Sequence, residues 1–142
     1  MWRVVGLVLA FLLAGCFQQP PFSPADIQAK RFEAVPGKAV IYVVRDYPDL
    51  TDDQASIYLD DAIMITTYPG TYYRWETQPG VHRISGFAGD SGRISFNTEP
   101  GRIYYVLQRL APFMRFPISH FYLIAEPQGR AAVGRAVLVG GQ

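Results

Sequence analysis

The hydrophobic and polar positions divide the chain into an apolar N-terminal block and a series of short segments typical of strands. Val4 to Ala14 is almost entirely apolar, whereas apolar and polar residues alternate over shorter intervals after residue 38. Ala39 to Arg45 is apolar on both faces, which is typical of a central strand. Ala55 to Asp60 alternates instead, and the alternation predicts that Ile57 and Leu59 face a core.

Pro-Gly pairs punctuate the middle of the chain. Proline presets the first central position of a type II turn, and glycine adopts the positive φ that the second position requires. Short strand-length segments between such turns predict an all-β fold, a small antiparallel β-sandwich. The Pro-Gly pairs stand at 36–37, 69–70, 79–80 and 100–101, Asp60-Asp61 is the expected hairpin turn, and the remaining strand segments are 63–67, 71–77, 81–87, 93–97, 103–109 and 121–126.

Three less regular segments accompany this β domain, which is predicted to span 38–128. A short helix is expected within 24–37, running from Pro24 to about Ala34, with Ser23 as its cap and Asp26 placed to answer that cap. Leu110 to His120 contains two prolines and is expected to be an irregular excursion. The stretch 129–142 is a C-terminal tail in which a short helix and a last strand both remain open.

The N-terminal block has the pattern of a secretory signal peptide at 1–15. Arg3 is the one charge before an apolar run, and small residues precede Cys16, the single cysteine. An uncleaved membrane helix is one alternative, although the run is short for a hydrocarbon core of about 30 Å. A signal peptide with an ordinary soluble product is another. A short, proline-containing tether follows at 16–23.

Leu13-Ala14-Gly15-Cys16 resembles the lipobox of bacterial lipoproteins. In that family the chain is cut before the cysteine, whose sulfur carries diacylglycerol and whose new amine is acylated. The resemblance implies lipidation of Cys16 and attachment to a membrane, and two or more acyl chains anchor stably. Phe17 and Gln18 follow without an aspartate, which resembles default sorting to the outer membrane. The expected location is the cell envelope, facing the periplasm.

Charge and cysteine content narrow the function classes. Apart from Arg3, the basic residues equal the acidic ones in number, so no basic stripe supports nucleic-acid binding. With one cysteine there is no intramolecular disulfide, and packing alone must hold the domain together. No cofactor motif is present, and none is expected.

Two sequence blocks, 68–84 and 96–105, together with 39–42 and the hairpin at 57–60, resemble a family of small bacterial lipoproteins known only as a domain of unknown function. They are also similar to the wider group of PEGA-type β-sandwich modules. The resemblance covers roughly Lys38 to Glu126. It implies a β-sandwich in the envelope and carries over no catalytic residue. Asp60-Asp61-Ala62 departs from the Asp-Gly-Lys of many relatives in the first hairpin.

Candidates for catalysis or metal binding are sparse. His82 and His120 are the only histidines, and without His or Cys partners at ligand spacing each is expected to be a surface or turn residue. Gly89-Asp90-Ser91-Gly92 superficially resembles a hydrolase motif but is better interpreted as a hairpin loop. The aspartates at 46, 49, 52 and 53 lack calcium-loop spacing and predict a solvated loop.

The aromatic block at 72–75 is the strongest binding candidate. On a strand, Tyr72 and Arg74 share one face, which is expected to be exposed, while Tyr73 and Trp75 share the other. Tyr72, Arg74 and Arg83 therefore form the candidate surface for a partner or ligand. Simple cross-strand pairing is the structural alternative.

Three functions follow from these observations. The first is a non-enzymatic accessory or interaction module, lipid-anchored in the envelope, to whose edge strands a partner segment adds. The second is a binding protein for cell-wall glycan or another small ligand that uses exposed aromatics. A hydrolase that pairs His82 or His120 with an aspartate is the third, and no motif supports it.

Overall fold

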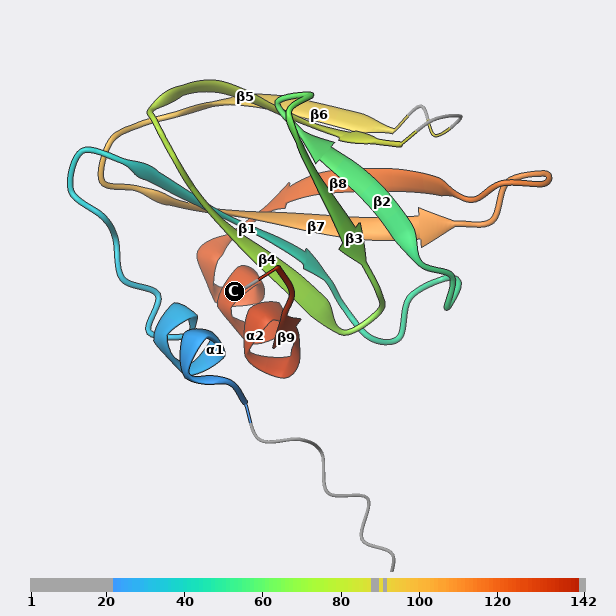
Figure 1. The fold of residues 1–142 in the computed structure, drawn as a ribbon, viewed down its shortest axis with the longest axis horizontal. Helices are drawn as coiled ribbons and strands as arrows, with labels where there is room; N and C mark the ends of the chain where they lie inside the picture. The colour runs from blue at the N-terminus through green and yellow to red at the C-terminus, as the bar shows by residue number, and fades with distance from the viewer. Residues whose placement is uncertain (1–21, 88–89, 91, 141–142) are drawn as a thin grey trace, which may run out of the picture.

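The computed structural model describes residues 22–87, 90 and 92–140, and Cys16 lies outside them. Two sheets and two short helices make up the fold (Figure 1). The elements are α1 (Pro24–Ala29), β1 (Ala39–Arg45), β2 (Ala55–Leu59), β3 (Ile63–Thr67), β4 (Thr71–Thr77), β5 (Gly80–Gly86), β6 (Arg93–Thr98), β7 (Ile103–Ala111), β8 (Ile118–Ile124), α2 (Glu126–Arg135) and β9 (Val137–Leu138).

The chain is mostly β, as predicted, and most strand pairs are antiparallel. One sheet has the order β8-β7-β1-β4-β9 and the other β3-β2-β5-β6. The predicted antiparallel pairing is confirmed for most neighbours, but two pairs, β1–β7 and β4–β9, are parallel. Parallel neighbours need a long connection. Here residues 46–102 separate β1 from β7, and α2 lies in the connection that leads to β9.

An apolar core lies between the two sheets. Ile41 and Val43 of β1 meet Ile57 and Leu59 of β2, so the alternation read from the sequence placed these two β2 residues correctly. Trp75 of β4 completes the centre of this cluster. The chain has no cysteine pair, and this buried apolar surface is one of its main sources of stability.

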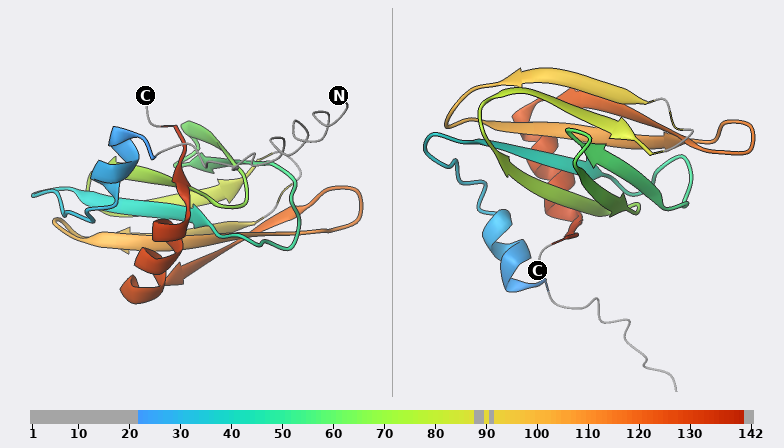
Figure 2. Two further views of the ribbon diagram at one scale, coloured as in Figure 1. Left: turned by 90° about the horizontal axis from the view of Figure 1, so that it is seen from below. Right: turned by 45° about the horizontal axis from the view of Figure 1, so that its top comes forward.

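A second apolar core lies on the other face of the five-stranded sheet, beneath the helices (Figure 2). Tyr42 and Val44 of β1 pack there with Val133 of α2 and Ala29 of α1. Both faces of β1 are therefore covered, and all seven of its residues are buried. This confirms the prediction of a central strand.

Most of the expected turns adopt the backbone conformations that their residues favour, but Gly80 has a φ of 139° and begins β5 instead of occupying a type II turn. Asp60 and Asp61 have φ values of 49° and 58°, so the β2–β3 hairpin closes through two left-handed residues, as in a type I′ turn. Gly70 and Gly101 have φ values of 79° and 71°, as expected after proline in a type II turn.

Helix α1 is shorter than predicted. Ser23 caps it by accepting a hydrogen bond from the Asp26 N–H at 3.1 Å, but the helix ends at Ala29 rather than near Ala34. Phe32, with a φ of 53°, turns the chain soon afterwards. The Asp26 carboxylate does not answer the cap as expected, because it points into the protein instead.

The C-terminal stretch forms both of the elements that the sequence left open. Helix α2 begins at Glu126, within the range predicted for the β domain, and β9 follows it and pairs with β4. Gly129 faces the ring of Tyr105 so closely that a side chain at this position would collide with it. Glycine thus lets α2 lie directly on the sheet.

Residues 110–120 are more regular than predicted. Strand β7 continues to Ala111 and β8 begins at Ile118, so only 112–117 is irregular. The two prolines in this stretch bracket the turn instead of interrupting the strands, because both lie at strand ends, where proline is tolerated. Figures 1 and 2 show the hairpin of β7 and β8 projecting beyond the other loops at that end of the molecule.

Candidate functional site

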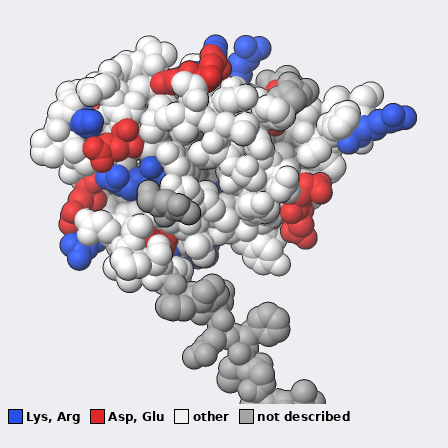
Figure 3. All heavy atoms as spheres, viewed as in Figure 1, with Lys and Arg blue, Asp and Glu red and all other residues white. Residues whose placement is uncertain are grey.

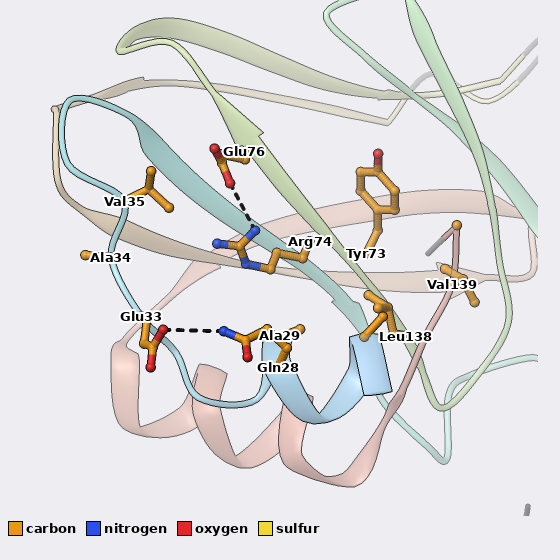
Figure 4. Close-up of a pocket in the computed structure, with 12 residues that line it drawn as sticks. Gln28, Ala29, Glu33, Ala34, Val35, Tyr73, Arg74, Glu76, Leu138 and Val139 are labelled. Carbon is orange, nitrogen blue, oxygen red and sulfur yellow. Dashed lines mark hydrogen bonds and ion pairs between the residues drawn. The ribbon is translucent and has the colours of Figure 1, made fainter. Parts of the chain in front are cut away.

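Arg74 lies in a groove between α1 and strand β4 (Figure 4). The groove has a volume of about 460 Å³, and Gly140, beyond β9, lies at its rim. Its walls come from parts of the chain far apart in sequence. The lining residues are Ala25, Gln28, Ala29, Glu33, Ala34, Val35, Tyr73, Arg74, Glu76, Leu138, Val139 and Gly140.

The polar groups of the groove form two pairs that leave its centre open. Arg74 donates to the Glu76 carboxylate at 3.3 Å, and Gln28 donates to Glu33 at 3.4 Å (Figure 4). Both pairs are exposed and long, so each is weakly held and open to exchange for a ligand. The lining contains neither His, Cys, Ser nor Thr. The groove therefore offers charge and hydrogen bonds to a ligand.

Strand β4 presents to this groove backbone groups that pair with none of the described residues. The N–H groups of Val137 and Val139 donate to the carbonyls of Gly70 and Tyr72, at 2.9 and 2.8 Å. Backbone N–H and C=O groups alternate sides along a strand. In β4, the backbone groups of the even-numbered residues therefore point away from β1. Pairing with β9 stops at Tyr72.

Arg74 and Glu76, the next two even-numbered residues of β4, lie beyond the end of this pairing. Their backbone N–H and C=O groups face the groove, and no hydrogen bond joins them to the backbone of another described residue. A row of this kind is a template for an added strand. The sequence pattern made Arg74 a binding candidate because of its side chain. The structure shows that its outward-facing backbone groups are the stronger indication of a binding site.

The prediction that Tyr72 is exposed was wrong. Tyr72 is fully buried beneath α1, and its hydroxyl donates to the Asp26 carboxylate at 2.8 Å. Burial, together with the hydrogen bond to Asp26, raises the pKa of the Tyr72 phenol far above its usual value. A helix covers the face that the strand pattern predicted to be free, so Tyr72 supports the core and cannot touch a partner.

Arg83 lies away from Arg74, on the other sheet. It is half-exposed and pairs with Asp61 in the β2–β3 turn. The three residues predicted to form one surface are therefore separate. Arg74 alone lies in the groove.

His82 is buried, contrary to the prediction of a surface or turn histidine. Its Nδ1 lies 2.7 Å from an Asp60 carboxylate oxygen, and its Nε2 lies 2.6 Å from the Gln78 carbonyl. Both ring nitrogens therefore lie within hydrogen-bond distance of an oxygen. The ring also contacts Trp75 edge to face. Neither nitrogen is available to a substrate, so this histidine–aspartate pair has a structural geometry. His120 is exposed, as predicted.

The aspartate-rich loop after β1 is not simply solvated as predicted. The Asp49 carboxylate is buried and binds the Arg45 guanidinium, which is itself fully buried, at 2.6 Å. Arg45 also donates to backbone carbonyls of the loop, those of Thr51 at 2.7 Å and Asp53 at 2.6 Å. An arginine at the end of an otherwise apolar strand was the available signal for this cluster.

The glycine-rich loop at 89–92 does connect two strands, β5 and β6, although 89 and 91 lie outside the described residues. Asp90 accepts hydrogen bonds from the N–H groups of Gly92 and Ser119 at 2.9 and 2.7 Å. It thereby ties this loop to β8. Among residues 22–87, 90 and 92–140, no cluster of three or more His, Cys, Asp or Glu side chains is arranged to hold a metal ion.

Within the same described ranges, neither helix has the length and apolar character that a membrane crossing requires. No protein-family model matches the chain, and no curated protein matches it. The resemblance to small envelope lipoproteins and PEGA-type modules stays a prediction from the sequence.

Proposed function

We propose that the protein is a bacterial lipoprotein, anchored through acylated Cys16 in the outer membrane and facing the periplasm. Its β-sandwich domain acts there as a non-enzymatic interaction module. The signal-peptide pattern at 1–15 and the small residues before Cys16 support the anchor. Phe17, and not an aspartate, follows Cys16, which supports the outer membrane as the location. Two sheets with an apolar core between them support the sandwich.

The groove beside β4 carries the proposed binding role. An extended segment of a partner protein adds to β4 beyond β9 and pairs with the outward backbone groups of Arg74 and Glu76. Strand addition obtains affinity from main-chain hydrogen bonds and specificity from alternate side-chain pockets. The apolar wall formed by Val35 and Leu138 and the charges of Arg74 and Glu33 supply such pockets.

Intact mass tests the anchor. The protein extracted from membranes is expected to have the mass of residues 16–142 plus acyl chains, and Cys16→Ser is expected to lose the acyl mass. A wild-type mass that retains Met1, or an unmodified product beginning after the signal peptide, would contradict the lipoprotein proposal. Cys16 would then be a free thiol, and an enzymatic role would be reconsidered.

A proline on β4 tests strand addition. Glu76→Pro removes an N–H that faces the groove and leaves the pairing of β4 with β1 intact, because proline is tolerated where the N–H of an edge strand faces outward. We expect a photo-crosslinker placed at Ala34, another lining residue of the groove, to capture a membrane partner in the otherwise unchanged protein. The Glu76→Pro change is expected to weaken this capture about 3- to 10-fold, equivalent to one backbone hydrogen bond.

Glu76→Ala is the matched control because it removes the same side chain and keeps the N–H. It is expected to retain most of the capture. Equal losses in the two variants would show that charge, and not backbone pairing, recognises the partner. Thermal unfolding of both variants verifies that the fold is kept.

A glycan ligand is the second candidate, because Tyr73 and Arg74 both line the groove. An aromatic face packs on a sugar ring, and arginine binds an acidic group. Sedimentation with purified cell-wall glycan separates the candidates. Glycan binding is expected to depend on the Tyr73 ring and to be insensitive to Glu76→Pro.

A further inference from the structure

The hairpin between β7 and β8 ends in an apolar tip, residues 112–117. Phe113, Met114 and Phe116 are 55, 95 and 73% exposed, although all three are large apolar residues. They lie within six consecutive residues of sequence Pro-Phe-Met-Arg-Phe-Pro. Contiguous exposed apolar surface of this kind marks a contact with a membrane, a ligand or another protein.

The tip is held in a defined shape. The Phe116 N–H donates to the Phe113 carbonyl at 2.9 Å, which closes a tight turn. Met114 sits inside this turn with a φ of 47°, a conformation that side-chain-bearing residues seldom adopt. The turn thus holds Met114 at the apex, almost fully in solvent, instead of letting it fold back onto the sheet. Such strain is retained where the surrounding structure enforces it.

The tip carries a single positive charge. Arg115 is its single charged residue, and it forms no ion pair with the described residues. On the face drawn in Figure 3, the projection at the right carries basic atoms, and the nearest large acidic cluster lies on the body, below and to the left of it. Apolar side chains beside one unpaired arginine match the boundary between acyl chains and anionic headgroups.

We propose that residues 112–117 are a second membrane contact, which inserts into the headgroup region of a bilayer containing anionic phospholipid. The apolar side chains enter the acyl boundary, and Arg115 reaches the lipid phosphates. This inference rests on the proposed placement at a membrane. Five residues lie between Cys16 and Phe22, so the tether spans at most about 20 Å and keeps the domain beside the bilayer.

Depth-dependent quenching tests the insertion. Acylation blocks the Cys16 thiol, so Met114→Cys supplies the one thiol for a fluorescent label in the intact lipoprotein. The labelled protein is reconstituted in vesicles of phosphatidylethanolamine and phosphatidylglycerol containing a doxyl-labelled lipid. We expect strong quenching and a blue-shifted emission. Val81→Cys is the matched control, since Val81 is also highly exposed (73%) but lies on β5. It is expected to stay unquenched.

Two further variants separate the contributions. Phe113→Ser combined with Phe116→Ser is expected to reduce quenching at position 114 several-fold, while thermal unfolding stays unchanged because both residues are exposed. Arg115→Gln is expected to remove the preference for phosphatidylglycerol over phosphatidylcholine. Equal solvent accessibility at 114 and 81 would overturn the proposal. Shielding at 114 that disappears when the protein is diluted in lipid would also overturn it, because it would assign the tip to a second copy of the chain.

The state of the anchor is determined separately. If the chain carries no acyl groups, Cys16 takes up a second label, which is visible by mass. This result rejects the anchor and does not bear on the tip. Vesicles are then added to the Cys16→Ser, Met114→Cys protein, and the comparison with the Cys16→Ser, Val81→Cys protein decides the role of the tip independently.

Discussion

Arg45→Met is expected to lower the free energy of unfolding by about 3–5 kcal/mol, the usual cost of removing one partner from a buried ion pair. Methionine has a similar length, so little volume is lost. The change instead leaves the Asp49 carboxylate buried without its guanidinium, and it leaves loop carbonyls without donors. For a domain of this size the midpoint of thermal unfolding should fall by roughly 10 °C or more.

The size of this effect follows from the number of groups to which the Arg45 guanidinium donates hydrogen bonds. Its guanidinium binds Asp49 and the carbonyls of Thr51 and Asp53, all from inside the protein. Asp49 in turn accepts the Leu110 N–H at 3.0 Å, which connects the loop after β1 to β7. Lysine cannot replace this fork, because an ammonium is a point charge.

Arg109→Met is the matched control. Arg109 also approaches Asp49, at 3.7 Å, but its side chain is 44% exposed. Its loss is expected to cost less than about 1 kcal/mol, as is typical of surface pairs. Chemical denaturation of both variants measures the difference. Equal costs would mean that burial does not determine the strength of the Asp49 pairs.

Asp26→Ala is expected to lower the free energy of unfolding by about 3 kcal/mol, because a buried carboxylate with several partners disappears. Asp26 accepts hydrogen bonds from the Tyr72 hydroxyl at 2.8 Å and from the Leu138 N–H at 3.0 Å. It also pairs with Lys30 at 2.9 Å. One side chain of α1 therefore holds both β4 and β9.

Hydrogen exchange distinguishes this connection from a general loss of stability. The Val139 amide, which donates to the Tyr72 carbonyl, is expected to exchange faster in Asp26→Ala than the amides of β1. Ser23→Ala removes only the cap of α1 and should cost about 1 kcal/mol without this local effect. Unchanged protection of Val139 in Asp26→Ala would contradict the role assigned to Asp26.

The strands were predictable because the local pattern of apolar and polar residues indicates which of their side chains are buried. Ile57 and Leu59 alternate with polar residues, and β1 is apolar throughout, so each face could be assigned from neighbours along the chain. Asp60 and Asp61 likewise favour the turn in which they occur. These features need no knowledge of distant segments.

The candidate site was predicted only in part, because its character depends on distant segments. The β4 pattern indicates two faces but not that α1 covers the face of Tyr72. A tyrosine can be exposed or can donate to a buried acceptor, and Asp26, its partner, lies 46 residues away. The groove around Arg74 depends on where β9 stops pairing, which residue types do not encode. The prediction that Asp49 lies in a solvated loop was wrong because charges usually remain in water.

The position of β1 also sets the order in which the protein can fold. Its neighbours are β4 and β7, whose pairing brings Ile41 against Trp75 on one side and Tyr104 on the other. Closing such long loops costs chain entropy before any contact compensates for it. A nascent chain that has emerged only through β3 holds an apolar strand with neither neighbour available. Stable structure must therefore await most of the chain, and β1 needs protection from aggregation until β7 arrives.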